Sequence, residues 1–256
     1  MKPAAPALES EGLGIRFGGQ VAVDDVSCAF HPGTLTAIVG PNGAGKTTYF
    51  NLLSGQLRAS AGEVRLDGVT ITRLPPSRRS RLGLGRAFQL TNLFPSLSVL
   101  ENVRLAVQAR AGIGLDVFSR ATRHRALIER AHAVLAQVRL QARAAVPAVA
   151  LSHGDQRKLD VAILLALEPS VFLFDEPTAG MSVDEAPVVL DLIEQIKVAR
   201  RATILLVEHK MDVVRRLADR VIVLHQGRLV ADGAPEEVVA SAVVQEAYLG
   251  RRAGHG

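Results

Sequence analysis

Nine consecutive residues, Gly40 to Thr48, have the composition of a loop that binds phosphate groups. They read Gly-Pro-Asn-Gly-Ala-Gly-Lys-Thr-Thr and fit the pattern G-x-x-x-x-G-K-[ST]. Glycine lets the backbone approach phosphate oxygens closely, so that its N–H groups face them. Lys46 can reach the β- and γ-phosphates of a nucleotide, and the hydroxyl of Thr47 can bind Mg²⁺. The segment therefore predicts a site for nucleotide phosphates and Mg²⁺.

Two adjacent carboxylates, Asp175 and Glu176, follow the apolar run Val171–Phe174. Neighbouring carboxylates at the end of a buried strand are costly unless a cation or a water molecule needs them. Asp175 could hold Mg²⁺ through water, and Glu176 could polarise an attacking water molecule. A solvated acidic turn is the alternative, and the phosphate-binding pattern earlier in the chain favours the catalytic interpretation.

The pattern of apolar residues predicts the elements that must position these groups. Short strands are expected at 14–17, 21–30, 34–39 and 63–66, and the third leads through the phosphate loop into a helix at 46–54. The middle of the chain shows helical spacing at 99–110 and 120–138. Alternation then resumes, with strands at 171–174 and 203–207, helices at 155–167, 187–199 and 211–217, and a hairpin at 221–231. The sequence thus predicts an α/β fold: a mostly parallel core, an antiparallel β portion and an inserted α-helical subdomain.

Length and composition exclude several classes of protein. With 256 residues and 48% hydrophobic residues, the chain can bury a sizeable core, which excludes a mainly disordered protein. The longest apolar run, Val161–Leu167, is too short to cross a bilayer, which needs about 20 residues. The single cysteine, Cys28, cannot form an intramolecular disulfide, and we expect it to be buried in a strand. A reducing location is expected. Residues 1–11 have no apolar signal region and are interpreted as a frayed tail.

The formal net charge of +5 makes the protein basic. Nucleic acid, an anionic membrane surface and phosphate-bearing ligands are the partner classes that such a charge suits. The excess of arginine over lysine, beside abundant alanine, valine and leucine, is also typical of codon bias in a GC-rich genome, and we favour that explanation.

Three further segments narrow the interpretation to a family. They are Leu151-Ser-His-Gly-Asp-Gln156, Gly85-Arg-Ala-Phe-Gln89 and Val207-Glu-His209. Together with the phosphate loop and the acidic pair, their order and spacing resemble the nucleotide-binding subunit of ATP-binding cassette (ABC) transporters. The resemblance covers residues 8–249 and implies a single ABC ATPase domain of the P-loop NTPase class. Its core would comprise about 8–88 and 149–249 and its helical subdomain about 89–148, with flexible tails at 1–7 and 250–256.

The resemblance implies a role for each matching residue. Phe17 would stack on adenine, Gln89 would meet Mg²⁺ and water, and His209 would contact the γ-phosphate. Ser152 and Gly154 match the signature motif, which completes the ATP site of a second subunit. The expected catalytic residues are Glu176, His209, Lys46 and Gln89, and the expected Mg²⁺ ligands are Thr47, Gln89 and Asp175. The expected nucleotide-binding residues are Phe17, Gly40, Pro41, Asn42, Gly43, Ala44, Gly45, Lys46, Thr47, Thr48, Ser152 and Gly154.

Two segments depart from the common family pattern. The signature usually reads Leu-Ser-Gly-Gly-Gln, and here His153 and Asp155 replace its third and fifth residues. After the acidic pair the family often has Ser-Ala-Leu-Asp, and here Ala-Gly-Met-Ser ends on Ser182 instead of aspartate. Two roles are open for His153: contact with the partner's nucleotide, or capping of the helix. These departures resemble the branched-chain amino-acid importer branch, and urea and short-amide importers share the Leu-Ser-His-Gly feature.

The resemblance implies an ATPase that powers uptake of branched-chain or other hydrophobic amino acids, at the cytoplasmic face of the inner membrane. Its expected partners are a second identical or paralogous ATPase subunit, two transmembrane permease subunits and, indirectly, a periplasmic solute-binding protein, with no nucleic acid. We expect 88–99, with apolar Leu93, Phe94 and Leu97, to dock a permease helix or to form a satellite core cluster. The alternatives are a urea or short-amide importer, a non-catalytic subunit and a soluble ABC ATPase acting on nucleic acid.

Overall fold

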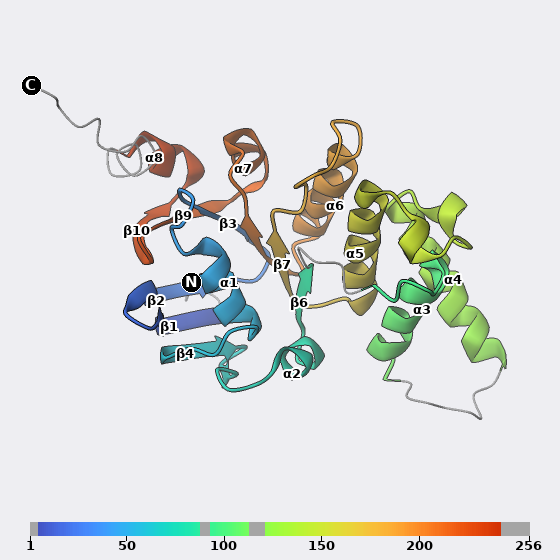
Figure 1. Ribbon diagram of the computed structural model, residues 1–256, viewed down its shortest axis with the longest axis horizontal. Coiled ribbons are helices and arrows are strands. Elements are labelled where there is room, and N and C mark those ends of the chain that lie inside the picture. Colours follow the sequence, from blue (N-terminus) through green and yellow to red (C-terminus); the bar gives the residue numbers. More distant parts are fainter. Residues whose placement is uncertain (1–4, 88–92, 113–120, 242–256) are drawn as a thin grey trace, which may run out of the picture. The chain divides into compact units, whose positions relative to one another are not determined.

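A computed structural model describes residues 5–87, 93–112 and 121–241. The chain divides into two units, each of which is described by itself. The first unit comprises Met1–Leu84, Ser170–Glu176 and Lys197–Gly256, and the second comprises Gly85–Pro169 and Pro177–Ile196. Helices and strands alternate along the chain (Figure 1), which confirms the predicted α/β fold. Within the described residues, no helix combines the length and the apolar character that a membrane span requires.

A six-stranded sheet with a parallel centre carries the first unit, although only the first residue of its edge strand Leu84–Ala87 belongs to that unit. Its strand order is β10-β9-β3-β8-β7-β6. The strands are β3 (Leu35–Val39), β6 (Leu84–Ala87), β7 (Val171–Asp175), β8 (Thr203–Val207), β9 (Arg220–His225) and β10 (Arg228–Gly233). β3 pairs in parallel with β8 and β9, and β7 pairs in parallel with β8, whereas β10 runs antiparallel to β9. Every residue of β3, β7 and β8 is buried, as expected for central strands covered on both faces.

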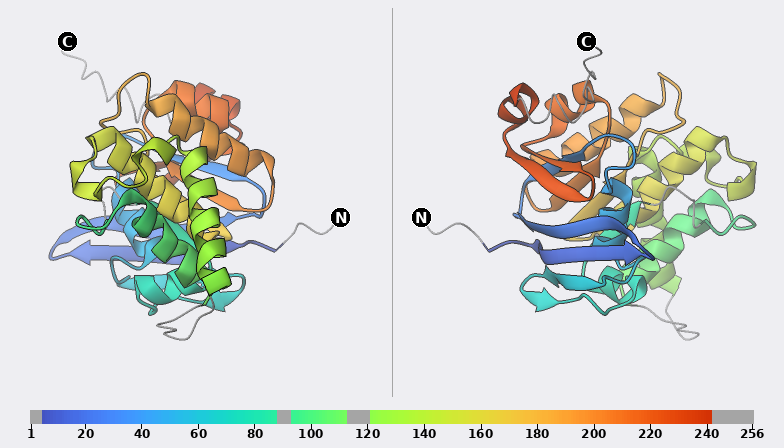
Figure 2. Two further views of the ribbon diagram at one scale, coloured as in Figure 1. Left: turned by 90° about the vertical axis from the view of Figure 1, so that its right-hand side faces the viewer. Right: turned by 60° about the vertical axis from the view of Figure 1, so that its left-hand side comes forward.

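Alternate residues of these strands pack into two separate cores, because successive side chains of a strand point to opposite faces. Ile38 of β3 joins the core that contains α1 (Lys46–Ser54), whereas Ala37 and Val39 join the core under α7 (Met211–Leu217) and α8 (Pro235–Ala240). The helix that follows the phosphate loop is therefore buried against one face of the sheet. Figures 1 and 2 show α1 between this sheet and a second one.

The second sheet of the first unit is antiparallel, with the order β2-β1-β4-β5. Its strands are β1 (Leu8–Phe17), β2 (Gln20–Phe30), β4 (Ala61–Leu66) and β5 (Val69–Thr70). β1 pairs with both β2 and β4, which confirms the predicted antiparallel portion. The expectation of a frayed tail through residue 11 is wrong, because β1 begins at the fully buried Leu8. Cys28 lies buried in β2, as predicted.

Helices make up most of the second unit. They are α3 (Val99–Arg110), α4 (Ala121–Gln137), α5 (His153–Leu167) and the greater part of α6 (Ala186–Val198). Ser98 caps α3 by accepting a hydrogen bond from the Glu101 amide at 3.1 Å. The buried Asn102 side chain then ties the preceding loop to this helix through bonds with the backbone of Phe94 and Ser98. The helices predicted at 99–110 and 120–138 are thus confirmed.

One short helix of the first unit, α2 (Pro76–Arg81), shows no apolar periodicity and depends on tertiary hydrogen bonds. Its Arg79 is 1% exposed and donates to the carbonyl oxygens of Leu52 and Leu53, at the end of α1, at 2.8 and 2.6 Å. It also donates to the carbonyls of Thr72 and Leu74. These bonds satisfy carbonyls that the end of a helix leaves open. Burial lowers the pKa of Arg79 to about 10.

Candidate functional site

The predicted phosphate loop connects the buried strand β3 to α1, and its glycines meet a steric requirement. A Cβ at Gly45, which adopts a φ of +97°, would lie 2.5 Å from the Ala22 carbonyl oxygen of β2. A Cβ at Gly40 would overlap the Leu224 carbonyl oxygen of β9. The loop is also tied to the β9–β10 turn, because the Gly227 amide donates to the Ala44 carbonyl at 3.0 Å. The backbone of the loop is therefore held between two strands, and only glycine allows this approach.

Lys46, the first residue of α1, is folded toward the loop. Its Nζ donates to the carbonyl oxygens of Gly40 and Pro41 at 2.6 and 3.0 Å, and the residue is 8% exposed. Burial lowers the pKa of this ammonium, and the nearby carboxylates Glu176 and Asp175 act in the opposite direction. A largely buried ammonium at the start of a helix suits a highly charged anion such as a polyphosphate.

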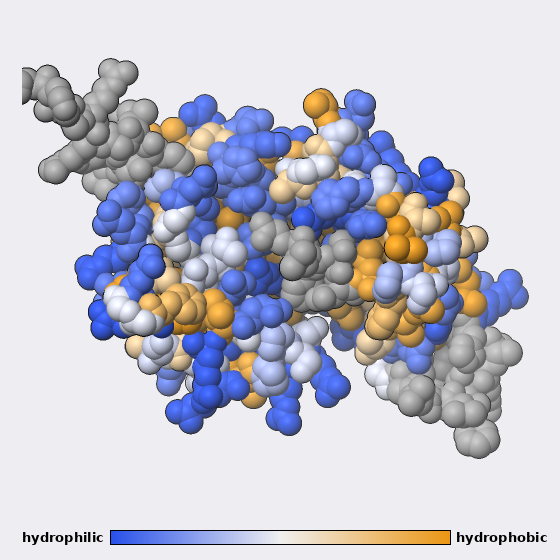
Figure 3. Space-filling view, viewed as in Figure 1, coloured by the Kyte–Doolittle hydropathy of each residue, from blue (hydrophilic) through white to orange (hydrophobic). Residues whose placement is uncertain are grey.

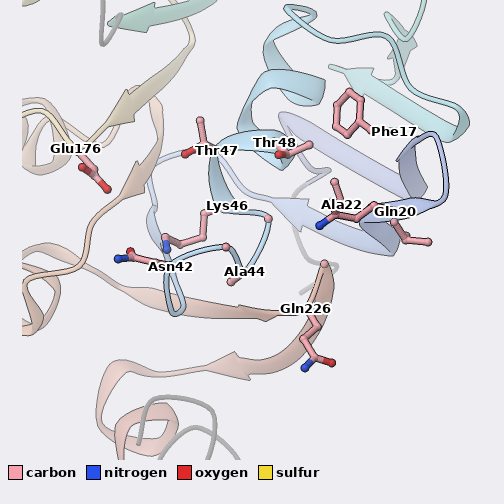
Figure 4. A pocket seen from close by; sticks show the side chains of 14 residues that line it. Phe17, Gln20, Ala22, Asn42, Ala44, Lys46, Thr47, Thr48, Glu176 and Gln226 are labelled. Atoms are coloured by element: carbon pink, nitrogen blue, oxygen red, sulfur yellow. The ribbon is translucent and has the colours of Figure 1, made fainter. Parts of the chain in front are cut away.

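A cavity of about 520 Å³ lies over this loop. Its wall is formed by Phe17, Gln20, Val21, Ala22, Asn42, Gly43, Ala44, Gly45, Lys46, Thr47, Thr48, Glu176, Gln226 and Gly227. Figure 4 shows Phe17 and Glu176 at opposite ends, with Thr47 and Thr48 between them. Phe17 is 51% exposed, so its ring is available to a flat ligand at that end. The cavity thus combines an aromatic ring, a phosphate-type loop and a carboxylate.

The cavity wall brings together most of the predicted nucleotide-binding residues of the first unit. It also includes residues that the sequence did not single out, namely Gln20, Val21, Ala22, Gln226 and Gly227. These residues come from the turn and start of β2 and from the β9–β10 turn, far from the loop in sequence. In the sequence, these residues are marked only by the turn sequences Gly18-Gly19 and His225-Gln226-Gly227. Such sequences predict turns but give no sign of a ligand.

The two carboxylates lie where β7 ends. Asp175 is the last residue of the strand and is 3% exposed, and Glu176 follows with a φ of +46°. The left-handed region is unfavourable for a residue other than glycine, and such backbone strain is concentrated at functional sites. The Glu176 amide donates to the Val207 carbonyl at 3.0 Å, which fixes the turn against the end of β8.

His209 lies beside Glu176 because β8 ends next to β7. The His209 Nδ1 is 3.8 Å from Glu176 Oε1, and the His209 side chain is 56% exposed. The preceding residue, Glu208, is 1% exposed, and its Oε1 accepts hydrogen bonds from the amides of His209 and Lys210 at 3.0 and 3.2 Å. Glu208 therefore holds the turn that carries His209. Sequence reasoning missed this role, although a carboxylate directly after a buried strand was the signal used for Asp175.

The described residues among those expected to hold Mg²⁺ carry oxygen donors. Thr47 lines the cavity, and Asp175 lies close enough to Lys46 to act on its pKa. Hydroxyl and carboxylate oxygens are the ligands that Mg²⁺ prefers, together with substrate phosphates. The donors present therefore fit Mg²⁺. The third expected ligand, Gln89, lies outside the described residues.

The other two predicted nucleotide-binding residues, Ser152 and Gly154, belong to the second unit. Ser152 is the N-cap of α5, and its hydroxyl accepts a hydrogen bond from the Asp155 amide at 3.2 Å. The suggestion that His153 caps this helix is therefore wrong. The start of a 15-residue helix suits an anion, because its first amides and the helix dipole point toward it.

Comparisons with known proteins point to one family. Residues 23–179 match the ABC transporter family model, and residues 228–254 match a model described as branched-chain amino acid ATP-binding cassette transporter. The chain is 35% identical over 250 residues to the high-affinity branched-chain amino acid transport ATP-binding protein LivG of Escherichia coli, covering 96% of this chain and 98% of the relative. It is 36% identical over 251 residues to BraF of Pseudomonas aeruginosa, a protein of the same description, at 96% and 98% coverage.

Solved structures show the same fold. A nucleotide-free ATP-binding cassette from an ABC transporter matches with a TM-score of 0.80 and 26% identity, covering 95% of this chain and 99% of that one. An ABC transporter cassette in its ADP conformation matches with a TM-score of 0.78 and 26% identity, at 95% and 98% coverage.

Proposed function

We propose an import function from the premise that this chain belongs to the ATP-binding family of ABC transporters, whose members hydrolyse ATP. In this proposal the chain powers the uptake of branched-chain or other hydrophobic amino acids. The observation that carries it is the match of residues 228–254 to the branched-chain family, beside relatives of that description over nearly the whole chain. Urea or short-amide uptake is the alternative that the Leu-Ser-His-Gly segment leaves open.

The proposed substrate site is the cavity over the phosphate loop. Adenine stacks on Phe17, and the phosphates lie against the amides of 40–48 and the ammonium of Lys46. To meet a phosphate, Lys46 exchanges its bonds with the Gly40 and Pro41 carbonyls for charge-assisted bonds. Mg²⁺ bound with the nucleotide neutralises phosphate charge, and the side chains proposed to hold it are Thr47, Asp175 and Gln89.

The proposed hydrolytic group is Glu176, which orients and deprotonates the attacking water. Its backbone is fixed by the bond to Val207, so that the carboxylate projects from a rigid turn at the end of β7. His209, 3.8 Å away, would contact the γ-phosphate, and Glu208 would hold His209 in place. Catalysis in this scheme comes mainly from positioning and charge stabilisation, as is general for phosphoryl transfer.

The proposed working unit is a head-to-tail dimer with an identical or paralogous ATPase subunit. Ser152 and Gly154 of one subunit would complete the nucleotide site formed by 40–48 of the other. The hydroxyl and the start of α5 would then meet the γ-phosphate, and hydrolysis would release this contact and reset the dimer.

The proposed membrane partners are two permease subunits, which places the chain at the cytoplasmic face of the inner membrane. The docking surface proposed for them contains Phe94, which is 56% exposed, beside the half-buried Leu93 and Leu97. Figure 3 shows hydrophobic side chains gathered on the second unit, over α3 and α5. A periplasmic solute-binding protein would deliver the solute to the permeases.

Uptake measurements test this function in cells that lack the gene. Cells complemented with the wild-type chain should accumulate labelled leucine, and cells complemented with Glu176→Gln should not. Labelled urea and acetamide serve as competing solutes in the same assay. Restored uptake of urea or acetamide without leucine would favour the alternative, and restored uptake of none of the three solutes would contradict both importer assignments.

A further inference from the structure

The two segments that depart from the common family pattern contact each other in the second unit. A Cβ at Gly180 would lie 3.3 Å from both Cδ2 and Nε2 of His153. Contacts this short are tighter than side chains normally make, so an alanine at 180 would crowd the imidazole. The common pattern has the reverse sizes, with glycine at the position of His153 and alanine at the position of Gly180. This chain therefore carries the larger side chain at 153 and the smaller one at 180.

A second contact joins the first turn of α5 to Glu185, three residues after Ser182. The Glu185 carboxylate lies directly against Gly154, and a methyl group there would overlap it. Lys158 of α5 is 2.9 Å from Asp155 and 3.8 Å from Glu185. Two consecutive residues of the first turn of α5, His153 and Gly154, thus each contact the loop that leads into α6.

The turn 182–185, which directly precedes α6, is held in shape by reciprocal bonds of the capping-box type. The Ser182 hydroxyl accepts from the Glu185 amide at 3.3 Å, and Glu185 Oε2 accepts from the Ser182 amide at 3.2 Å. Ser182 stands where the family usually has aspartate, and its hydroxyl accepts a backbone hydrogen bond that an aspartate oxygen could also accept. Because Glu185 is fixed by Ser182, its contact with Gly154 is part of an ordered structure.

We propose that His153 and Gly180 are a matched pair that positions the first turn of α5. The imidazole, which is itself exposed, lies against the space that a side chain at 180 would fill, and so sets the register between this turn and the loop at 177–182. His153 is a positioning residue here, acting through Ser152 and Gly154, and this proposal rests on their proposed contact with the partner subunit's nucleotide. Pro177 directly follows Glu176 in the chain. The pair therefore connects the segment after Glu176, the proposed hydrolytic residue of this subunit's own nucleotide site, with the turn that would contact the nucleotide of the partner subunit.

A double-mutant cycle in the purified transporter complex tests the pair. Gly180→Ala should lower the maximal ATPase rate about fivefold, because the methyl pushes the imidazole and displaces the turn. His153→Ala should cost about twofold. The double variant should be faster than Gly180→Ala alone, because removing the ring makes room for the methyl. The KM for ATP should change less than about twofold in all three variants, since the phosphate loop is untouched.

Backbone strain needs its own control, because Gly180 has a φ of +74°. Gly68 has a φ of +77° and no atom close enough to touch an added Cβ, so Gly68→Ala measures the strain of such a substitution alone. Thermal unfolding of each variant shows whether it folds. His153→Ala keeps the native Gly180. If Gly180→Ala is unstable, the double variant can therefore be compared with His153→Ala, and a similar rate in the two would show that the methyl is tolerated once the ring is removed.

The outcomes separate this inference from the proposed function. Additive losses in the cycle, or a Gly180→Ala variant as active as wild type, would overturn the matched pair. Ser152→Ala in the same assay tests the signature contact itself. A full rate in Ser152→Ala would overturn the proposed role of the turn, whereas a slow Ser152→Ala beside an unaffected Gly180→Ala would overturn only the pair.

Discussion

At the scale of single residues, Lys46 has the environment of a phosphate-binding cation. It is buried, donates to the Gly40 and Pro41 carbonyls of its own loop, and lies close to two carboxylates. A ligand that brings phosphate oxygens to this point gains charge-assisted bonds with an ammonium that is already in place. The affinity for nucleotide should therefore depend strongly on this one side chain.

Substitution of Lys46 by alanine should weaken ATP binding at least about tenfold, since a hydrogen bond to a charged group contributes about 1.5–3 kcal/mol. Titration of the purified chain with a fluorescent ATP analogue measures this. Arg125→Ala, which removes an exposed cation of the second unit, is the control for net charge and should bind normally. Equal affinities for Lys46→Ala and Arg125→Ala would contradict the phosphate-loop assignment.

Glu208 should matter through His209. Replacing Glu208 by alanine removes the acceptor of two backbone amides and should free the turn that carries His209. We expect the maximal ATPase rate to fall about tenfold or more with little change in KM, because misplacing a catalytic group affects the transition state more than ground-state binding.

Glu208→Gln is the matched control for this change, because its amide oxygen can accept the same two bonds. It should keep most of the activity that Glu208→Ala loses. If Glu208→Gln were as slow as Glu208→Ala, the carboxylate charge itself would matter, and the positioning role would be the wrong explanation.

At the scale of elements, α1 is anchored at both ends. Its first residues belong to the phosphate loop, and its last carbonyls bond to the buried guanidinium of Arg79. The Cβ of any residue at Gly55, just after the helix, would approach this guanidinium to 2.6 Å. The stability of α1, which follows the predicted phosphate loop, therefore depends on a side chain of the polar helix α2.

Arg79→Met should lower the free energy of unfolding by about 3 kcal/mol, because it removes the hydrogen bonds that the guanidinium donates to four backbone carbonyls. Urea unfolding followed by circular dichroism measures the loss. The matched control is Arg78→Met on the same helix, where the side chain is exposed, and it should change stability by less than about 0.5 kcal/mol. An equal midpoint for the two variants would show that the Arg79 bonds do not stabilise the fold.

Elements with a strong local signal were predicted well. The helices Lys46–Ser54 and Val99–Arg110 match the structure because a glycine-rich turn and a serine cap mark their starts. The short elements β5, α2, β6 and α8 were not predicted, since two to six residues carry too little periodicity and their stability comes from tertiary contacts.

The same difference applies to the site. Gly40–Thr48 and Asp175–Glu176 could be found because each is continuous in sequence and carries its chemistry in its own residues. Gln20, Ala22 and Gln226 could not, because they line the cavity only after β2 and the β9–β10 turn are brought to the loop. The contact between His153 and Gly180 was likewise visible only as two separate departures from a family pattern.

At the scale of the whole molecule, the proposed function requires that nucleotide chemistry be passed to membrane partners. The cavity belongs to the first unit, and Ser152, Gly154 and the proposed docking surface around Phe94 belong to the second. Variants in these regions should therefore fail in different ways. Substitutions in the cavity should change nucleotide binding or hydrolysis, and substitutions at Phe94 should weaken binding to the permease subunits.

Phe94→Ser should reduce co-purification of the permease subunits from solubilised membranes at least about threefold, since a buried aromatic anchor is worth more than 1 kcal/mol at an interface. ATP binding to the purified chain should be unchanged. Val69→Ser, which alters a 59% exposed apolar residue of the first unit, is the control and should co-purify normally. Normal recovery of permeases with Phe94→Ser would place the docking surface elsewhere.

One measurement tests whether Glu176 hydrolyses ATP bound in the cavity and so drives transport. ATP hydrolysis by the purified transporter complex is compared for the wild type and Glu176→Gln, with bound nucleotide quantified in parallel. We predict that Glu176→Gln binds ATP with near-normal affinity, hydrolyses it at least about a hundredfold more slowly and accumulates as an ATP-bound dimer. Normal turnover by Glu176→Gln would show that this carboxylate is not the hydrolytic group.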